Sequence, residues 1–145
     1  MTIAEGLIAG VVAGALMGAA SWGGHRLGWF KSNLISIDGR FATRLLRLKS
    51  TPPWTYALGI PMHLVTSAIF GIIYAGIVRL LDVRAGSALV ILPYVVVLWM
   101  GMLFTALPVA GAGLLGRKVG PNVWAEQLVI HAVFGAVFWW ALTGL

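Results

Sequence analysis

Four long stretches without Asp, Glu, Lys or Arg dominate this chain and limit what it can fold into. They cover residues 6–25, 50–78, 85–116 and 127–145. A helix of about 20 apolar residues crosses the hydrocarbon core of a bilayer, which is about 30 Å thick. Charged residues make up only 10% of the chain, whereas a soluble domain carries about 25%. We therefore predict an all-α integral membrane protein, a bundle of four transmembrane helices.

The expected helix boundaries follow from the ends of these stretches and from the prolines. We place the four spans at residues 3–25, 53–79, 87–115 and 122–144. Together they form a single transmembrane domain over residues 1–145. Pro61 lies inside the second span, and Pro93 and Pro108 lie inside the third. Because proline removes a backbone hydrogen bond from a helix, we expect the second and third helices to be kinked.

A stripe of glycines marks the expected packing face of the first helix. Its members, each four residues from the next, are Gly6, Gly10, Gly14 and Gly18. In water each interior glycine would weaken a helix by about 1 kcal/mol, but in lipid the missing side chain lets a second helix approach closely. We predict that this glycine zipper packs against a helix of the same chain or of another copy. Gly71 and Gly135 are expected to serve as packing positions in the second and fourth helices.

The connection between the first two spans predicts a short amphipathic helix over residues 38–49, with Asp38 as its N-cap. Its expected apolar side comprises Ile37, Phe41, Leu45 and Leu48. Arg40, Arg44 and Arg47 fall on the opposite side. This pattern favours a helix on the membrane surface, with its arginines among lipid phosphates. The acidic surface of a partner protein is the alternative ligand for these arginines.

Basic residues are distributed unequally over the connections, and the net charge is +6. Eight of the ten flank or lie in the first and third connections, and only Arg79 and Arg84 lie in the second. By the positive-inside rule, the first and third connections are cytoplasmic and both termini lie outside. This placement indicates contact with lipid headgroups and argues against nucleic-acid binding. The chain has no cysteine, which excludes disulfides and thiolate metal sites.

His63 and His131 are the notable ionisable residues expected at membrane depth. Polar side chains there usually face the interior of a bundle, because hydrocarbon does not solvate them. We expect the two histidines to face each other as neutral groups. Their expected partners are on neighbouring helices and include Ser67, Thr66, Gln127 or a carbonyl exposed by a kink.

Three sharper interpretations of these histidines remain as alternatives. In the first, His63 and His131 are the axial ligands of haem b, with space provided by Gly71 and Gly135. In the second they belong to a proton relay. In the third, Ser67 and His131 form a hydrolytic dyad, although Ser67 lacks a glycine-rich nucleophile turn. A zinc site lacks an obvious third ligand. We predict no catalytic site and no resident cofactor.

The second and fourth spans share a sequence pattern. Residues 61–74 align with residues 125–138 at Leu-Val, Ala and Phe-Gly, with an aromatic residue three positions after each glycine. The match suggests two helical hairpins of related origin. Because the second and fourth spans run in the same direction, the repeat would be parallel. Convergent use of Phe-Gly at tight helix contacts is the alternative.

Three segments together resemble a known family. They are the glycine-rich first helix, the loop Asn33–Gly39 and the helix His63–Ala75. They are similar to small four-helix prokaryotic inner-membrane proteins of the YagU-like kind, over most of the chain. The resemblance implies a topology and a location in the inner membrane, but no chemistry.

The sequence as a whole predicts a protein that is not an enzyme. We expect a packing or assembly component, or an accessory subunit of a larger membrane complex. Its expected partners are membrane lipids, and either other membrane subunits or further copies of itself. A small transporter or channel is the first alternative, and a haem-binding electron carrier is the second.

Overall fold

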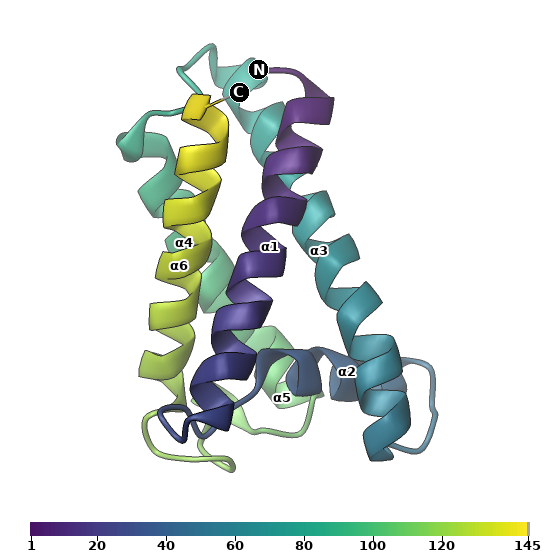
Figure 1. Ribbon diagram of the computed structural model, residues 1–145. Coiled ribbons are helices and arrows are strands. Elements are labelled where there is room, and N and C mark those ends of the chain that lie inside the picture. Colours follow the sequence, from purple (N-terminus) through teal and green to yellow (C-terminus); the bar gives the residue numbers. More distant parts are fainter. Residues whose placement is uncertain (145) are drawn as a thin grey trace.

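The structure is a computed structural model that describes residues 1–144, and within that range its elements are helices. Four of them are long and apolar enough to cross a membrane, namely α1 (Ile3–Arg26), α3 (Pro52–Leu81), α4 with its continuation (Ala88–Val109) and α6 (Val123–Gly144). The short helix α2 (Leu34–Leu45) crosses one end of this bundle (Figure 1). The prediction of an all-α, multi-pass membrane bundle is confirmed.

Local signals at the helix ends explain where two of the spans begin. α1 starts with a capping box, in which the Glu5 N–H donates to Thr2 Oγ1 over 3.1 Å and the Thr2 N–H donates to Glu5 Oε2 over 2.9 Å. α3 begins at Pro52, where a missing N–H costs nothing, and continues through Pro61. The predicted spans 3–25, 53–79 and 122–144 differ from the observed helices by at most two residues at either end.

The third span ends earlier than predicted. α4 covers Ala88–Gly101, a π-helical segment η1 covers Met102–Ala106, and α5 covers only Leu107–Val109. Gly111 and Gly113 then adopt positive φ angles of 81° and 76°, a conformation that glycine tolerates and that ends a helix. The predicted boundary at residue 115 is therefore wrong, because the apolar run continues into a loop.

The start of α2 also differs from the prediction. Asn33 is the N-cap, and its side chain accepts a hydrogen bond from the Ser36 N–H over 3.4 Å. The prediction of a helix over residues 38–49 with Asp38 as its cap is wrong, because an earlier asparagine provides the capping oxygen. Asp38 instead lies inside the helix.

Glycine allows α2 to pack directly on α3. A Cβ atom at Gly39 would collide with the Thr55 carbonyl, and a Cβ atom at Gly59 would collide with the Ile35 carbonyl. Ile37, on the expected lipid side of α2, is completely buried. α2 is therefore part of the protein core at this end of the bundle and is more than a helix adsorbed on the membrane surface.

The glycine stripe of α1 lies against α3 within the same chain. A Cβ at Gly6 would meet the Gly71 carbonyl, one at Gly10 would meet the Ser67 carbonyl, and one at Gly14 would meet the Ser67 side chain. The contact is reciprocal, because a Cβ at Gly71 would meet the Gly6 carbonyl. The two helices therefore approach along their backbones. α1 also packs against α6, so it lies at the centre of the bundle (Figure 1).

The start of α1 and the end of α6 lie together at one end of the bundle (Figure 1). The connection between α3 and α4 is at the same end, whereas α2, α5 and the connection to α6 are at the other. Eight basic residues lie in the helix ends and connections at this second end, namely Arg26, Lys31, Arg40, Arg44, Arg47, Lys49, Arg117 and Lys118. We call it the basic end of the bundle.

Candidate functional site

A cavity separates α3 from α4, although the two helices are consecutive in the chain. α3 packs on α1 and α2, whereas α4 packs on α6. The cavity has a volume of about 420 Å³. Aromatic side chains link the two helices on the side of the start of α1, where the Tyr94 hydroxyl donates to the Phe70 carbonyl over 2.6 Å and the Tyr74 and Tyr94 rings lie 5.0 Å apart.

Most of the lining is apolar, with a few polar side chains. The lining residues are Met17, Leu34, Asp38, Phe41, Met62, His63, Thr66, Ser67, Phe70, Val97, Leu98, Gly101, Met102, Thr105, Ala106, His131 and Phe134. On the α4 side, Val97 is 62% exposed, and Gly101 and Thr105 are also exposed. Because α3 and α4 are both membrane-spanning helices, an opening between them leads into lipid. We call this space the lateral cavity, because it lies between two helices that are long and apolar enough to span a membrane.

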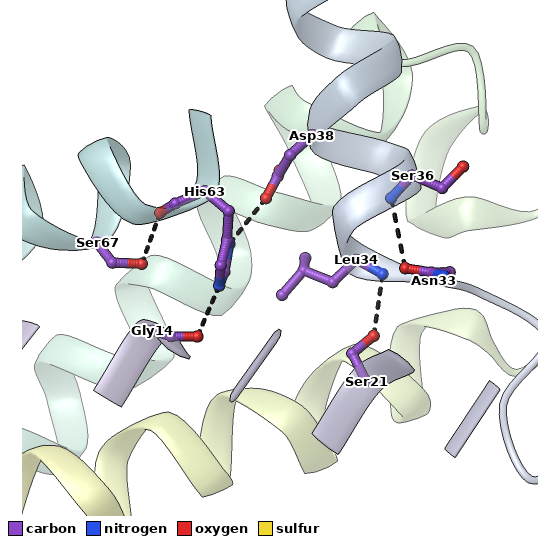
Figure 2. A network of polar contacts seen from close by, with 8 residues as sticks. All are labelled: Gly14, Ser21, Asn33, Leu34, Ser36, Asp38, His63 and Ser67. Carbon is purple, nitrogen blue, oxygen red and sulfur yellow. Dashed lines mark hydrogen bonds and ion pairs between the residues drawn. The ribbon is translucent and has the colours of Figure 1, made fainter. Parts of the chain in front are cut away.

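His63 lies at the crossing of three helices near the basic end. Its Nε2 atom lies 2.9 Å from the Gly14 carbonyl oxygen of α1, and its Nδ1 atom lies 2.8 Å from Asp38 Oδ2 of α2 (Figure 2). A carbonyl oxygen can only accept, so Nε2 carries a proton and donates to Gly14. The absence of a side chain at Gly14 brings this carbonyl within reach.

The Asp38–His63 contact is a neutral pair that shares one proton. Either the histidine is protonated and donates to the carboxylate, or the protonated carboxyl donates to a neutral ring. In both arrangements the pair has no net charge, which removes most of the cost of burying an ionised group. Burial raises the pKa of the Asp38 carboxyl above its ordinary value, and the hydrogen bond to His63 opposes this shift.

His131 borders the same cavity from α6. Its Nδ1 atom lies 2.7 Å from the Gln127 carbonyl oxygen, one turn earlier in the same helix. Because the carbonyl only accepts, Nδ1 is the protonated nitrogen of the neutral ring. The other nitrogen, Nε2, has no hydrogen-bond partner among residues 1–144.

A second polar cluster lies beside this site and connects α6 to the start of α2. The Glu126 carboxylate accepts from the Lys31 N–H over 2.9 Å, and from the Ser32 N–H over 2.9 Å and hydroxyl over 2.7 Å. The Gln127 side-chain N–H donates to the Ser32 hydroxyl oxygen over 3.1 Å. These bonds fix the chain just before α2, and they thereby position Asp38 indirectly.

The histidine predictions are only partly in agreement with this arrangement. His63 and His131 line one cavity. Gln127 is a partner of His131 as predicted, but through its backbone carbonyl within the same helix, and the partners of His63 are not those predicted. His63 contacts Asp38 and the Gly14 carbonyl, and His131 bonds within its own helix. The Ser67 hydroxyl donates to the His63 carbonyl over 2.8 Å, so it is not paired with His131 as a dyad would require.

The arrangement does not fit haem ligation by both histidines. Both ring nitrogens of His63 are hydrogen-bonded, so none has a free lone pair directed at iron. The space expected at the two glycines is also filled, since Gly71 faces the backbone of α1 and a Cβ at Gly135 would lie 3.0 Å from the Val95 side chain. Residues 1–144 contain no group of three or more metal-ligating side chains.

The three arginines expected at lipid phosphates have different environments. Arg44 donates from its guanidinium to the Val109 carbonyl over 3.2 Å, at the end of α5. Arg40 donates from Nε to the Ser36 carbonyl over 3.3 Å. Arg47 follows the end of α2 with a φ of 56°. Headgroup binding therefore stays a prediction for these residues, and Arg44 also has a role within the fold.

Sequence reasoning missed Asp38 and Glu126 as site residues. The signal that points to them is the rarity of acidic residues, since the chain has only four. The local sequence indicates a cap at Asp38, whereas its partner in the structure lies 25 residues away. Only the tertiary contact of α2 with α3 brings the two together.

Comparisons with protein-family models, curated proteins and solved structures found no match to this chain. The resemblance to YagU-like proteins therefore stays a prediction, and the function must be argued from the site itself.

Proposed function

We propose that this protein is a non-catalytic membrane protein that binds a small amphiphile from the bilayer between α3 and α4. The observation that supports the proposal is the composition of the lateral cavity. Phe70, Val97 and Phe134 provide apolar walls, while Asp38 and His131 provide polar atoms in the same space. Apolar pockets with a few convergent polar groups are typical small-molecule sites.

The ligand would enter sideways from the bilayer. Its apolar part would contact the walls shared by α3, α4 and α6, and its polar end would lie near Asp38, towards the basic end. This orientation matches that of a membrane amphiphile, whose polar end lies near the headgroups. With the basic end on the cytoplasmic side, as the positive-inside rule suggests, the polar end would be close to the inner leaflet surface of a prokaryotic inner membrane.

An accessory role in a larger complex is compatible with ligand binding. One of the two predicted uses of the glycine zipper is packing against another copy of the chain. Gly6, Gly10 and Gly14 are occupied by α3 of the same chain, so this stripe does not call for a partner. Proteins that co-purify with the chain in mild detergent would support the accessory role directly.

A matched pair of glycine substitutions tests ligand binding. Gly101 borders the cavity, and a Cβ atom there meets nothing within 4 Å. Gly101→Leu should therefore fill the cavity without a backbone clash. Gly76 in α3 is also free of neighbours within 4 Å but is not part of the cavity lining, so Gly76→Leu is the control.

Native mass spectrometry of the protein released from membrane nanodiscs provides the measurement. We expect a small amphiphile to be retained by the unmodified protein and by Gly76→Leu, and to be lost from Gly101→Leu. Equal retention by both variants would refute the proposed site. The absence of any retained molecule from the unmodified protein would refute the proposed function.

A further inference from the structure

Two residues of the cavity lining each have an atom that acts only as an acceptor and has no partner in the described part of the chain, and these atoms constrain what can bind. One is Nε2 of His131, and the other is Oδ1 of Asp38. Neither has a hydrogen-bond partner among residues 1–144, and both residues line the cavity. The inference drawn from them rests on the proposed function, since it names the class of molecule that this site takes.

His131 Nε2 can act only as a hydrogen-bond acceptor in the neutral ring. The carbonyl of Gln127 fixes the proton on Nδ1, so the lone pair of Nε2 remains available. His131 is only 6% exposed, and the cavity that it borders is also lined by Phe134 and Met102. An unsatisfied acceptor in such an apolar place raises the free energy of the empty site.

Asp38 Oδ1 is an acceptor in both protonation arrangements of the Asp38–His63 pair. When the carboxyl is protonated on Oδ2 towards His63, Oδ1 is the carbonyl oxygen. When the proton lies on His63, Oδ1 is part of a carboxylate. The Asp38 side chain is 17% exposed and borders the cavity.

The other polar groups of the lining do not change this preference. The Ser67 hydroxyl already donates to the His63 carbonyl. Thr66 and Thr105 border the cavity, but a hydroxyl both donates and accepts. Threonine therefore serves donor and acceptor ligands equally, whereas Asp38 and His131 can pair only with donors.

From these contacts we infer that the cavity selects amphiphiles whose polar end donates hydrogen bonds, such as phenols and long-chain alcohols, over molecules of the same shape that only accept. An ether or ketone in the site would leave both acceptors unsatisfied and place its own oxygen near them. A phenol or alcohol hydroxyl would donate to one of them. An aromatic or aliphatic body would contact Phe70 and Phe134.

Two probes of nearly equal shape test this selection. para-Octylphenol has a hydroxyl that donates, and para-octylanisole has a methyl ether in its place. Binding to the full-length protein in nanodiscs is titrated by native mass spectrometry, and the membrane concentration of each probe is measured with protein-free nanodiscs. One buried hydrogen bond changes affinity by about tenfold, so we expect the phenol to bind about tenfold more tightly than the ether.

A variant of His131 tests whether its Nε2 atom contributes to the preference for the phenol. His131→Leu should weaken phenol binding, because it removes one of the two acceptors, and should leave ether binding unchanged. The control is His25→Leu, because His25 is exposed and bonds to the Phe30 carbonyl outside the cavity. If His131→Leu fails to fold, the comparison of the two probes on the unmodified protein still decides the question.

The possible results distinguish failure of the selection for donors from failure of amphiphile binding. Equal affinity of the phenol and the ether, both reduced by Gly101→Leu, would overturn the selection for donors while leaving amphiphile binding in place. No binding of either probe would also overturn the selection. The retention experiment with Gly101→Leu and Gly76→Leu would then judge the proposed function independently.

Discussion

The close contact of α1 with α3 predicts a large difference between two glycine-to-alanine substitutions in α1. At Gly10, a Cβ atom would collide with the Ser67 carbonyl and lie 3.0 Å from the Gly71 Cα atom. Both obstacles are backbone atoms, so no side-chain rotation can relieve the clash. At Gly23, a Cβ atom meets nothing within 4 Å. Gly23→Ala is therefore a matched control in the same helix.

The expected magnitude follows from these contacts. Both variants gain a similar helix propensity, at most about 1 kcal/mol in water. Only Gly10→Ala adds a methyl group to a packed interface, and such overpacking typically costs about 1–3 kcal/mol. The difference in unfolding free energy between the two variants should therefore be about 1–3 kcal/mol, with Gly10→Ala the less stable.

Equilibrium unfolding in mixed micelles measures this difference. Increasing SDS in a mild detergent unfolds the helices, and circular dichroism and tryptophan fluorescence follow the transition. Equal stability of Gly10→Ala and Gly23→Ala would mean that the glycine stripe faces lipid. It would then be wrong to place α1 at the centre of the bundle.

Three further predictions concern the basic end. Glu126→Gln weakens three hydrogen bonds to the segment before α2, so it should lower the unfolding free energy by about 1–3 kcal/mol in SDS titrations, whereas the exposed Asp82→Asn should change it little. Lys49 and Asp82 are exposed and lie next to opposite ends of α3. An impermeant thiol reagent should label Lys49→Cys only from the cytoplasm and Asp82→Cys only from outside. The reverse pattern would overturn the orientation. Because the Asp38–His63 pair keeps one shared proton in the folded state, whereas an unfolded histidine loses its proton above about pH 6.5, the contribution of the pair to stability should decrease as pH rises above about 6.5, and Asp38→Asn should remove that decrease in unfolding measurements.

The spans could be predicted from sequence because the bilayer imposes a simple requirement. A helix that satisfies its own backbone must be long and apolar to cross lipid. The glycine stripe likewise indicated a close helix contact, although the sequence did not identify α3 as the neighbour. The end of the third span was missed, since apolar composition continues into the loop at Gly111 and Gly113.

The site was less predictable because its contacts join distant segments. Asp38 meets His63 only because Gly39 and Gly59 let α2 lie directly on α3. A glycine within an apolar helix is compatible with many neighbours, so its presence did not specify this crossing. The local pattern instead favoured Asp38 as a cap and an exposed surface helix.

The internal repeat gains a spatial meaning from the structure. Tyr74 and Phe138 occupy aligned positions, and their rings meet edge to face with centroids 5.0 Å apart. Ser67 and His131 are another aligned pair, and both line the cavity. Equivalent faces of α3 and α6 thus point towards a shared interior. The related origin of the two helical hairpins stays a prediction.

Photo-crosslinking tests the central claim, amphiphile binding between α3 and α4, most directly. An octylphenol carrying a diazirine in its tail is irradiated with the protein in nanodiscs, and the labelled peptides are identified by mass spectrometry. We predict labelling at cavity residues such as Phe70, Val97 and Phe134, removed by excess para-octylphenol. Labelling spread over exposed lipid-facing residues such as Leu80 and Leu89, which are 84% and 87% exposed, and unaffected by the competitor would contradict the account.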